Sequence, residues 1–268
     1  MHISPRTVIF VSTLVILAAV FQATAQAAGI KRAFERTLKV TGPVEVSVNT
    51  VSSDFKVVSG EAGSLRVKFF VSPQNDRGLV PGSFEDQFRF LESHPPFRQD
   101  GNRITLGDST GVEVPKGISV DYELTVPAET RLSSQTRSGD FWIEGIRGPV
   151  TITTESGDIR MSSVRDNVKI RTSSGDIRLE QTESRGINIE SSSGDVSMQL
   201  PVKAGFDLSA HTTSGSIDIS PAFAGDAKLT ENEAHLKVHG GGVPVEVRTV
   251  SGDIRIHPSA RADHLAEN

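Results

Sequence analysis

Carboxylates recur at a fixed place in this sequence, each directly after a glycine. Clustered aspartates can ligate a cation or share a proton as a pair of acids. The alternative role is structural: glycine adopts a positive φ, and the Ser and Asp side chains bond backbone groups of a turn. The structural role is favoured, because the Gly-Gly-x-Gly-x-Asp nonapeptide of calcium-binding β-rolls is absent. The Ser-Gly-Asp turns contribute Gly139 and Asp140, Gly157 and Asp158, Gly175 and Asp176, Gly194 and Asp195, and Gly252 and Asp253.

Arginines accompany three of these aspartates. Arg160, Arg178 and Arg255 each lie two residues after an aspartate of the turn motif. On an extended strand, positions two apart share a face. We therefore expect these arginines to neutralise a column of stacked carboxylates.

The other polar residues form no motif that is typical of an enzyme or a metal site. There is no cysteine and no G-x-S-x-G, and Gly240 to Gly242 precede a strand pattern rather than a helix. His235 and His239 are four residues apart, which on a strand is about 13 Å, too far for one metal ion. The sequence predicts no catalytic residue, no cofactor and no metal site. A carbohydrate-active lyase or hydrolase is the alternative, and it would need a groove lined by two or more carboxylates.

Aromatic side chains offer the other candidate for recognition. Phe84, Phe88, Phe90 and Phe97 cluster in one stretch, and Trp142 falls on an outward strand position. They either cap the open end of a sheet stack or form a sticky patch for a ligand. We expect Phe84 and Phe88 to cap. The candidate partner-binding residues are Phe97, Arg98 and Trp142.

The elements that position these residues form a repeat. Gly139, Gly157, Gly175 and Gly194 are separated by 18, 18 and 19 residues. Apolar and polar residues alternate on both sides of each glycine, which indicates a strand, a turn and a second strand with one buried face. Ser214-Gly215-Ser216 is an altered copy. Ser53 and Ala234 occupy the glycine slot of two further expected copies.

A unit this short cannot bury its own apolar face and must stack on copies of itself. The sequence therefore predicts an all-β fold, a parallel β-solenoid of stacked rungs of about 18–19 residues, with one non-repeat insertion. The rungs are expected to stack in chain order from Gly139 to Gly252. An antiparallel sandwich is the alternative, because hairpins produce the same alternation within one unit.

The repeat strings resemble a known family. VTITTESGDIRM, VKIRTSSGDIRLE, INIESSSGDVSMQL and the closing GGGVPVEVRTVSGDIRI are similar to the putative-adhesin family of bacterial β-strand-repeat domains, a domain of unknown function. The resemblance covers about Phe34 to Ile256. It implies the repeat fold and an adhesin-like role, and it supplies no catalytic residues. Ser216, the Ala234 copy and the insertion depart from the pattern.

The expected organisation has five parts. Residues 1–28 have the pattern of a secretory signal peptide, with Arg6, an apolar run from Val8 to Phe21 and small residues near Ala25 to Ala28. Residues 29–71 hold the N-terminal strands and first rung, and 72–119 the insertion with a short helix and a hairpin. Residues 120–257 hold the solenoid repeats, and 258–268 a polar tail. Within the insertion, Arg98 to Asn102 indicate a turn before a strand that begins at Arg103.

Composition narrows the function further. The chain has 268 residues and a formal net charge of −5, which argues against electrostatic binding of nucleic acid. We expect a periplasmic or secreted protein without a transmembrane anchor after cleavage. Its predicted function is that of a non-enzymatic, adhesin-like interaction or scaffold module of the cell envelope. Its partner would be an envelope protein or polysaccharide.

Overall fold

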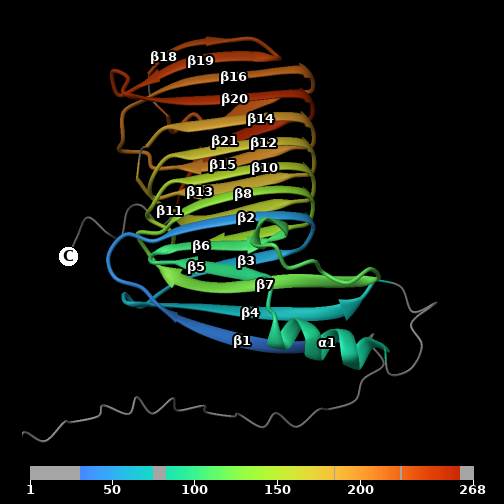
Figure 1. Cartoon of the computed structure of the whole chain (residues 1–268). Helices are drawn as coiled ribbons and strands as arrows, with labels where there is room; N and C mark the ends of the chain where they lie inside the picture. Colours follow the sequence, from blue (N-terminus) through green and yellow to red (C-terminus); the bar gives the residue numbers. More distant parts are fainter. Residues whose placement is uncertain (1–30, 75–82, 184, 224, 260–268) are drawn as a thin grey trace, which may run out of the picture.

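Two long β-sheets face each other and form a stack (Figure 1). The computed structural model describes residues 31–74, 83–183, 185–223 and 225–259. The expected signal peptide and most of the polar tail lie outside these residues. One sheet, sheet A, contains in spatial order β1 (Arg32–Lys39), β4 (Ser64–Pro73), β7 (Ile118–Pro127), β3 (Phe55–Gly60), β9 (Phe141–Glu144), β11 (Ile159–Val164), β13 (Ile177–Gln181), β15 (Val196–Leu200), β21 (Ile254–Pro258) and β17 (Ile217–Ile219).

The second sheet, sheet B, runs in the same stacking direction and supplies the other wall of the core. It contains in spatial order β18 (Gly225–Leu229), β19 (Glu233–Val238), β16 (Phe206–Ser214), β20 (Val243–Ser251), β14 (Ile187–Ser193), β12 (Val168–Ser174), β10 (Val150–Ser156), β8 (Arg131–Ser138), β2 (Glu45–Ser52), β6 (Arg103–Gly107) and β5 (Phe97–Asp100). An α-helix, α1 (Ser83–Ser93), and a 3₁₀ turn, η1 (Asp108–Thr110), complete the described elements.

Successive repeats lie side by side as parallel strands. Val150 pairs with Val168 and Ile152 with Ile170 in sheet B, and Ile159 pairs with Ile177 in sheet A. Each rung therefore gives one strand to each sheet, and its apolar side chains stack on the same positions of the neighbouring rung. The prediction of an all-β, solenoid-like fold with long parallel sheets is confirmed. Parallel pairing between repeats is not the arrangement of an antiparallel sandwich.

The alternation in the sequence sets which side chains form the core. Val150 and Ile152 on β10 and Ile159 on β11 are almost completely buried, whereas Thr153 between them in the pattern is exposed. The same holds at the expected early copy, where Val46, Val48, Phe55 and Val57 are buried. Ser53 lies in its turn and is itself buried.

The rungs do not stack in chain order, contrary to the expectation. β20 pairs with β14 on one side and β16 on the other, so the Gly252 rung lies between the Gly194 and Gly215 rungs. Its inward residues Val245, Val247, Ile254 and Ile256 are all buried, whereas Ile217 and Ile219 of the Gly215 rung are only half-buried. Ile217 and Ile219 are less buried because β17 is the terminal strand of sheet A, whereas β21 has a neighbour on each side.

The prediction of a rung at Ala234 was also wrong. β18 and β19 form an antiparallel hairpin within sheet B, with Leu229 opposite Ala234. Ala234, Leu236 and Val238 do face the core, but Leu229 is 58% exposed. The alternation of apolar and polar residues determines which face of a strand is buried, but not whether the next strand lies in the same sheet or the other one. Residues 225–238 therefore matched the repeat pattern although they do not form a rung.

Helix α1 packs at the opposite end of the stack, beside β1 (Figure 1). Phe84, Phe88 and Leu91 are buried on its inner face. The Phe88 ring lies 5.9 Å from that of Phe34 on β1, and Arg32 of β1 forms a 2.7 Å ion pair with Glu85. Phe84 and Phe88 thus cover the apolar end of the stack. Phe90 points away and is 45% exposed.

The turn expected from Arg98 to Asn102 is tighter in the structure. Arg98 and Asp100 belong to β5, which pairs antiparallel with β6, and the chain reverses at Gly101 and Asn102. Gly101 has φ of +59°, a conformation that suits a two-residue hairpin turn. Within the described ranges, the structure holds no helix with the length and hydrophobicity that a membrane span requires.

Candidate functional site

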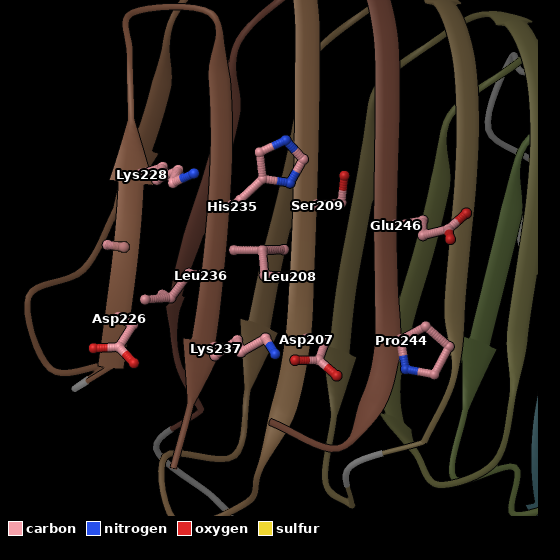
Figure 2. Close-up of a pocket in the computed structure, with 11 residues that line it drawn as sticks. Asp207, Leu208, Ser209, Asp226, Lys228, His235, Leu236, Lys237, Pro244 and Glu246 are labelled. Atoms are coloured by element: carbon pink, nitrogen blue, oxygen red, sulfur yellow. The ribbon is translucent and has the colours of Figure 1, made fainter. Parts of the chain in front are cut away.

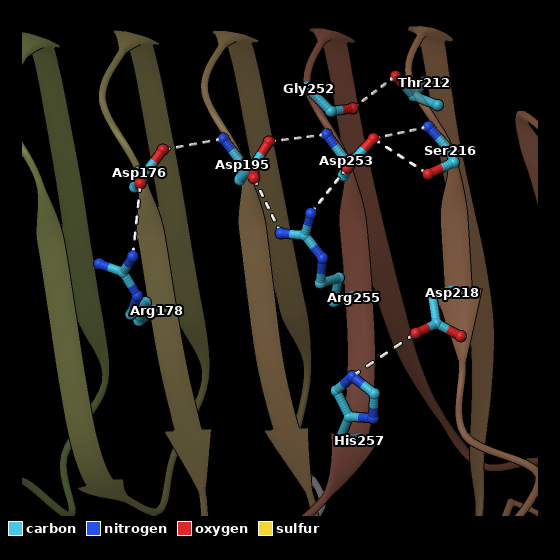
Figure 3. Close-up of polar contacts among 10 residues, drawn as sticks. All are labelled: Asp176, Arg178, Asp195, Thr212, Ser216, Asp218, Gly252, Asp253, Arg255 and His257. Atoms are coloured by element: carbon cyan, nitrogen blue, oxygen red, sulfur yellow. Dashed lines mark hydrogen bonds and ion pairs between the residues drawn. The ribbon is translucent and has the colours of Figure 1, made fainter.

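The aspartates of the repeat form one continuous hydrogen-bonded ladder. The Oδ1 atom of each aspartate accepts the backbone N–H of the residue in the same slot of the next rung. Part of this ladder, from Asp176 through Asp195 and Asp253 to Ser216, appears in Figure 3. Along the whole stack the acceptors are Asp121, Asp54, Asp140, Asp158, Asp176, Asp195 and Asp253, with donor–acceptor distances of 2.8 to 3.2 Å.

Ser216 ends the ladder. Its backbone N–H and its hydroxyl both donate to Asp253 Oδ1, at 2.9 and 3.0 Å. A serine offers no carboxylate to a further rung. This accounts for the altered copy lying at the end of the parallel stack.

The glycines of the ladder have no room for a side chain. At Gly157, Gly175 and Gly194, φ lies between +114° and +121°. A Cβ atom at Gly175 would meet the carbonyl oxygen of Gly157 at 2.2 Å. The close approach of successive turns therefore requires glycine, and each Ser-Gly-Asp supplies this together with the acceptor for the next rung.

Buried hydroxyls close each turn from the inside. In most turns the side chain three residues before the glycine donates to the serine carbonyl of the same turn, as Thr154 does to Ser156 at 2.9 Å and Thr172 to Ser174 at 3.0 Å. Thr212 instead donates to the Gly252 carbonyl of the neighbouring rung, at 3.0 Å (Figure 3). A buried polar group with such a partner avoids the cost of desolvation. Thr154 and Thr172, which are buried, therefore close their turns from the core side.

Arginines neutralise part of the carboxylate column. Arg160 pairs with Asp158 at 2.8 Å and Arg178 with Asp176 at 3.5 Å. Arg255 pairs with both Asp253 and Asp195, at 2.7 and 2.8 Å (Figure 3). The hydrogen bond from the Asp253 backbone N–H, and then the Arg255 guanidinium, hold the pKa of the Asp195 carboxyl below its usual range.

Asp195→Ala should lower the free energy of unfolding by about 1–2 kcal/mol at pH 7, because the Asp253 N–H loses its acceptor. Asp195→Asn keeps an oxygen acceptor and should cost less than about 1 kcal/mol, since the ion pair with Arg255 is exposed. Denaturant-induced unfolding measures both losses.

The stability of the wild type should also depend on pH. Folding lowers the pKa of Asp195, so the stabilisation by its charge is complete above about pH 4 and is lost as the pH falls through the lowered pKa. The wild type and Asp195→Asn should therefore converge in acid, and equal losses for the Ala and Asn variants at pH 7 would contradict the acceptor role.

Trp142 lies on the outward face of sheet A, where it is 51% exposed. Its neighbours in register are Lys56 on β3 and Arg160 on β11. Arg178 follows Arg160 on the next strand. These four side chains, here called the tryptophan row, are spaced about 4.8 Å apart by the strand separation. An exposed indole flanked by cations can stack on a ring and attract an anionic group at the same time.

Phe97 and Arg98 do not join Trp142. Both belong to β5 at the edge of sheet B, whereas Trp142 is on β9 of sheet A. Phe97 is half-buried and its ring lies 6.1 Å from that of buried Phe69, while Arg98 is exposed. Lys56 was missed as a candidate, although the early copy around Ser53 places it in the same slot as Trp142.

A groove of about 580 Å³ crosses sheet B near its β18 end (Figure 2). Strand register places Asp207 and Asp226 on either side of Lys237, and His235 opposite both Lys228 and Ser209. The Oδ1 atom of Asp207 is buried without a hydrogen-bond partner among the described residues. Sequence reasoning missed this groove because it took β18 and β19 for a rung.

No cluster of three or more potential metal ligands is present in the described part of the chain. The column aspartates instead bind backbone N–H groups and arginines. Burial, followed by the nearby Asp108 and Asp121 carboxylates, raises the pKa of the only tyrosine, Tyr122. Its phenol is therefore poorly suited to proton transfer at neutral pH.

Comparison with known proteins gives one family match. The model of the family described as Toastrack DUF4097 matches residues 98–257. No curated protein matches the chain.

Solved structures with low sequence identity are also similar. A putative cell adhesion protein from Clostridium sporogenes ATCC 15579 is 11% identical, with 85% of this chain and 100% of that chain covered and a TM-score of 0.42. A putative adhesin from Bacteroides fragilis NCTC 9343 is 12% identical, with 84% and 97% covered and a TM-score of 0.40. A putative lipid binding protein from Parabacteroides distasonis ATCC 8503 is 10% identical, with 86% and 96% covered and a TM-score of 0.27.

Proposed function

The chain belongs to the Toastrack DUF4097 family, and on that premise we propose that it is a non-enzymatic, adhesin-like interaction module of the bacterial envelope. The observation that carries the proposal is the tryptophan row of sheet A. The repeat itself supplies a rigid stack whose polar turn groups are occupied by one another. What the stack offers to a partner is therefore the outward face of its sheets.

The tryptophan row favours an acidic polysaccharide as the partner. The exposed Trp142 ring can pack on the apolar face of a sugar, as aromatic rings do in binding sites. Lys56 and Arg160, whose side chains are 53% and 39% exposed, pair with Glu123 and Asp158 at 3.5 and 2.8 Å. Exposed ion pairs are weak, so both cations can exchange these partners for carboxylate or phosphate groups on either side of that sugar. An envelope protein with an acidic surface is the other class of partner that an exposed indole beside cations could bind.

Trp142→Ala should weaken binding to isolated cell-wall polysaccharide by about tenfold or more, since a central aromatic anchor of this kind typically contributes about 2 kcal/mol or more. Its thermal stability should change little, because the indole is exposed. Calorimetric titration and thermal melts measure the two effects. Phe90→Ala is the matched control: this ring is also exposed but lies on α1, and its removal should leave binding unchanged. Retention of full affinity in Trp142→Ala, or no binding by the wild type, would contradict the proposal.

We also propose export to the periplasm or the medium, with removal of residues 1–28 and no membrane anchor thereafter. The support is the signal-peptide pattern of the sequence. The intact mass of the protein recovered from the producing cells tests it. A mass that still includes Met1 to Phe21 would contradict cleavage.

The groove on sheet B supports a second candidate function, that of a carbohydrate-active lyase or hydrolase. Asp207 and Asp226 are separated by two strand spacings, roughly 10 Å. This is close to the roughly 6.5–9.5 Å between the carboxyl groups of inverting glycosidases. However, Lys237 lies between them, and a cation there opposes the protonation that a general acid requires. Turnover of a polysaccharide that is lost in Asp207→Asn would favour the enzyme over the binding module.

A further inference from the structure

The outer edge of β18 is a free sheet edge. β18 is the terminal strand of sheet B, and no other strand in the described ranges pairs with its outer side. All five of its residues are exposed. At the opposite end of the stack, α1 packs beside β1 of sheet A, and β5 is the other terminal strand of sheet B.

The alternation of hydrogen-bonded pairs between β18 and β19 shows which backbone groups of β18 point outward from this edge. The Thr230 N–H donates to the Glu233 carbonyl at 2.8 Å, where the hairpin between β18 and β19 begins. Hydrogen-bonded pairs alternate along antiparallel strands, so Lys228 and Asp226 direct their backbone groups to β19. Gly225, Ala227 and Leu229 consequently direct their N–H and C=O groups outward.

The sequence of this edge is complementary to itself. If two copies of β18 pair antiparallel about Ala227, Asp226 lies opposite Lys228 of the second copy, and Lys228 opposite Asp226 of the second copy. Lys237 lies on the other side of Asp226, so positive and negative side chains alternate across the joined strands. Opposite charges directly across a strand pair are favourable, and like charges are not.

Side-chain size is complementary as well. The same register places Leu229 opposite Gly225 of the second copy. Leu229 is 58% exposed, while Gly225 has no side chain to cover that part of the edge. The pairing would leave space for the Leu229 side chain opposite Gly225 and would place no charged residue opposite a like charge.

We propose that two copies of this chain associate end to end through β18, around a two-fold axis at Ala227, so that sheet B continues from one copy into the other. The outward backbone N–H and C=O groups of Gly225, Ala227 and Leu229 in each copy become available for pairing. Because only five residues per copy take part, the interface is smaller than that of a stable dimer, and the association is weak and concentration-dependent. This surface is separate from the tryptophan row, so its failure would leave the proposed function intact.

Charge reversal on one side of the pair tests the proposal. Asp226→Lys places lysines opposite lysines in a dimer of that variant, and Lys228→Asp places aspartates opposite aspartates. Each variant alone should self-associate more weakly than the wild type, by about tenfold or more. An equimolar mixture should restore association, because the two lysines on β18 of one variant then face the two aspartates on β18 of the other.

Sedimentation equilibrium over roughly 1 µM to 1 mM measures these affinities. Glu155→Lys on β10 is the matched control: it makes the same charge change as Asp226→Lys far from the edge and should leave self-association unchanged. Recovery in the mixture alone supports pairing through β18. A wild type that stays monomeric throughout, single variants that associate like the wild type, or a mixture that stays monomeric would overturn it.

Discussion

Gly175→Ala should lower the free energy of unfolding by about 3 kcal/mol or more. The added Cβ would lie 2.2 Å from the carbonyl oxygen of Gly157, which is backbone and cannot rotate away. Its φ of +116° is also a conformation that alanine rarely adopts. The turn would have to move away from its neighbour, and the Oδ1 atom of Asp158 would then lose the Asp176 N–H. Urea-induced unfolding at pH 7 measures the loss.

Gly101→Ala is the control for the conformational part of that cost. Gly101 also has a positive φ, of +59°, but a Cβ there meets nothing within 4 Å. We expect a loss of about 1 kcal/mol, the ordinary cost of a left-handed residue. If both variants lost the same amount, close stacking of the turns would not be what requires glycine.

Ile170→Asp should cost several kcal/mol and is expected to prevent folding at physiological temperature. Ile170 is completely buried between the two sheets. Its neighbours in register are Ile152 and Ile189, so a carboxylate there would have no partner. Circular dichroism during thermal unfolding measures the effect.

Lys169→Asp tests the same strand one residue away. Lys169 is exposed, and its neighbours in register are Thr151 and Asn188. The expected change is well under about 1 kcal/mol. Equal shifts in melting temperature for Ile170→Asp and Lys169→Asp would contradict the observed register.

Local patterns predicted the buried faces well because burial and alternation follow from the strand geometry itself. Val150, Ile152 and Ile159 occupy inward positions in the sequence pattern and are buried in the structure. The stacking slot that makes Asp140 to Asp253 one column could also be inferred from the repeat. The hydrogen bond that each aspartate accepts could not, because it depends on the distance between turns.

The order of the strands in the sheets was less predictable, because rungs with the same pattern of inward residues can each pair with the same neighbouring rung. Leu208 and Val245 have the same inward position, and either could lie beside Ile187. Only Val245 does. Ser216 was the available indication, since a rung without the carboxylate is suited to the end of the column.

The candidate sites illustrate the same limit. The pairing of Lys56 with Trp142 joins residues far apart in the sequence, through a rung copy in which Ser53 replaces the glycine of the motif. The groove with Asp207 and Lys237 depends on a hairpin that the repeat pattern concealed. The polar residues of residues 225–238 do not follow the Ser-Gly-Asp repeat, so their grouping becomes visible only when the strands are placed.

The position of β20 and β21 inside the stack bears on how the chain folds. A chain that adds rungs in order can proceed only to β15, because the strands that belong next to β14 and β15 come last. Leu208 has the same inward position as Val245, so the place beside Ile187 suits both residues until β20 arrives. Once β20 is in place it pairs on both sides, so the final strands are protected from the fraying that is usual at a chain end.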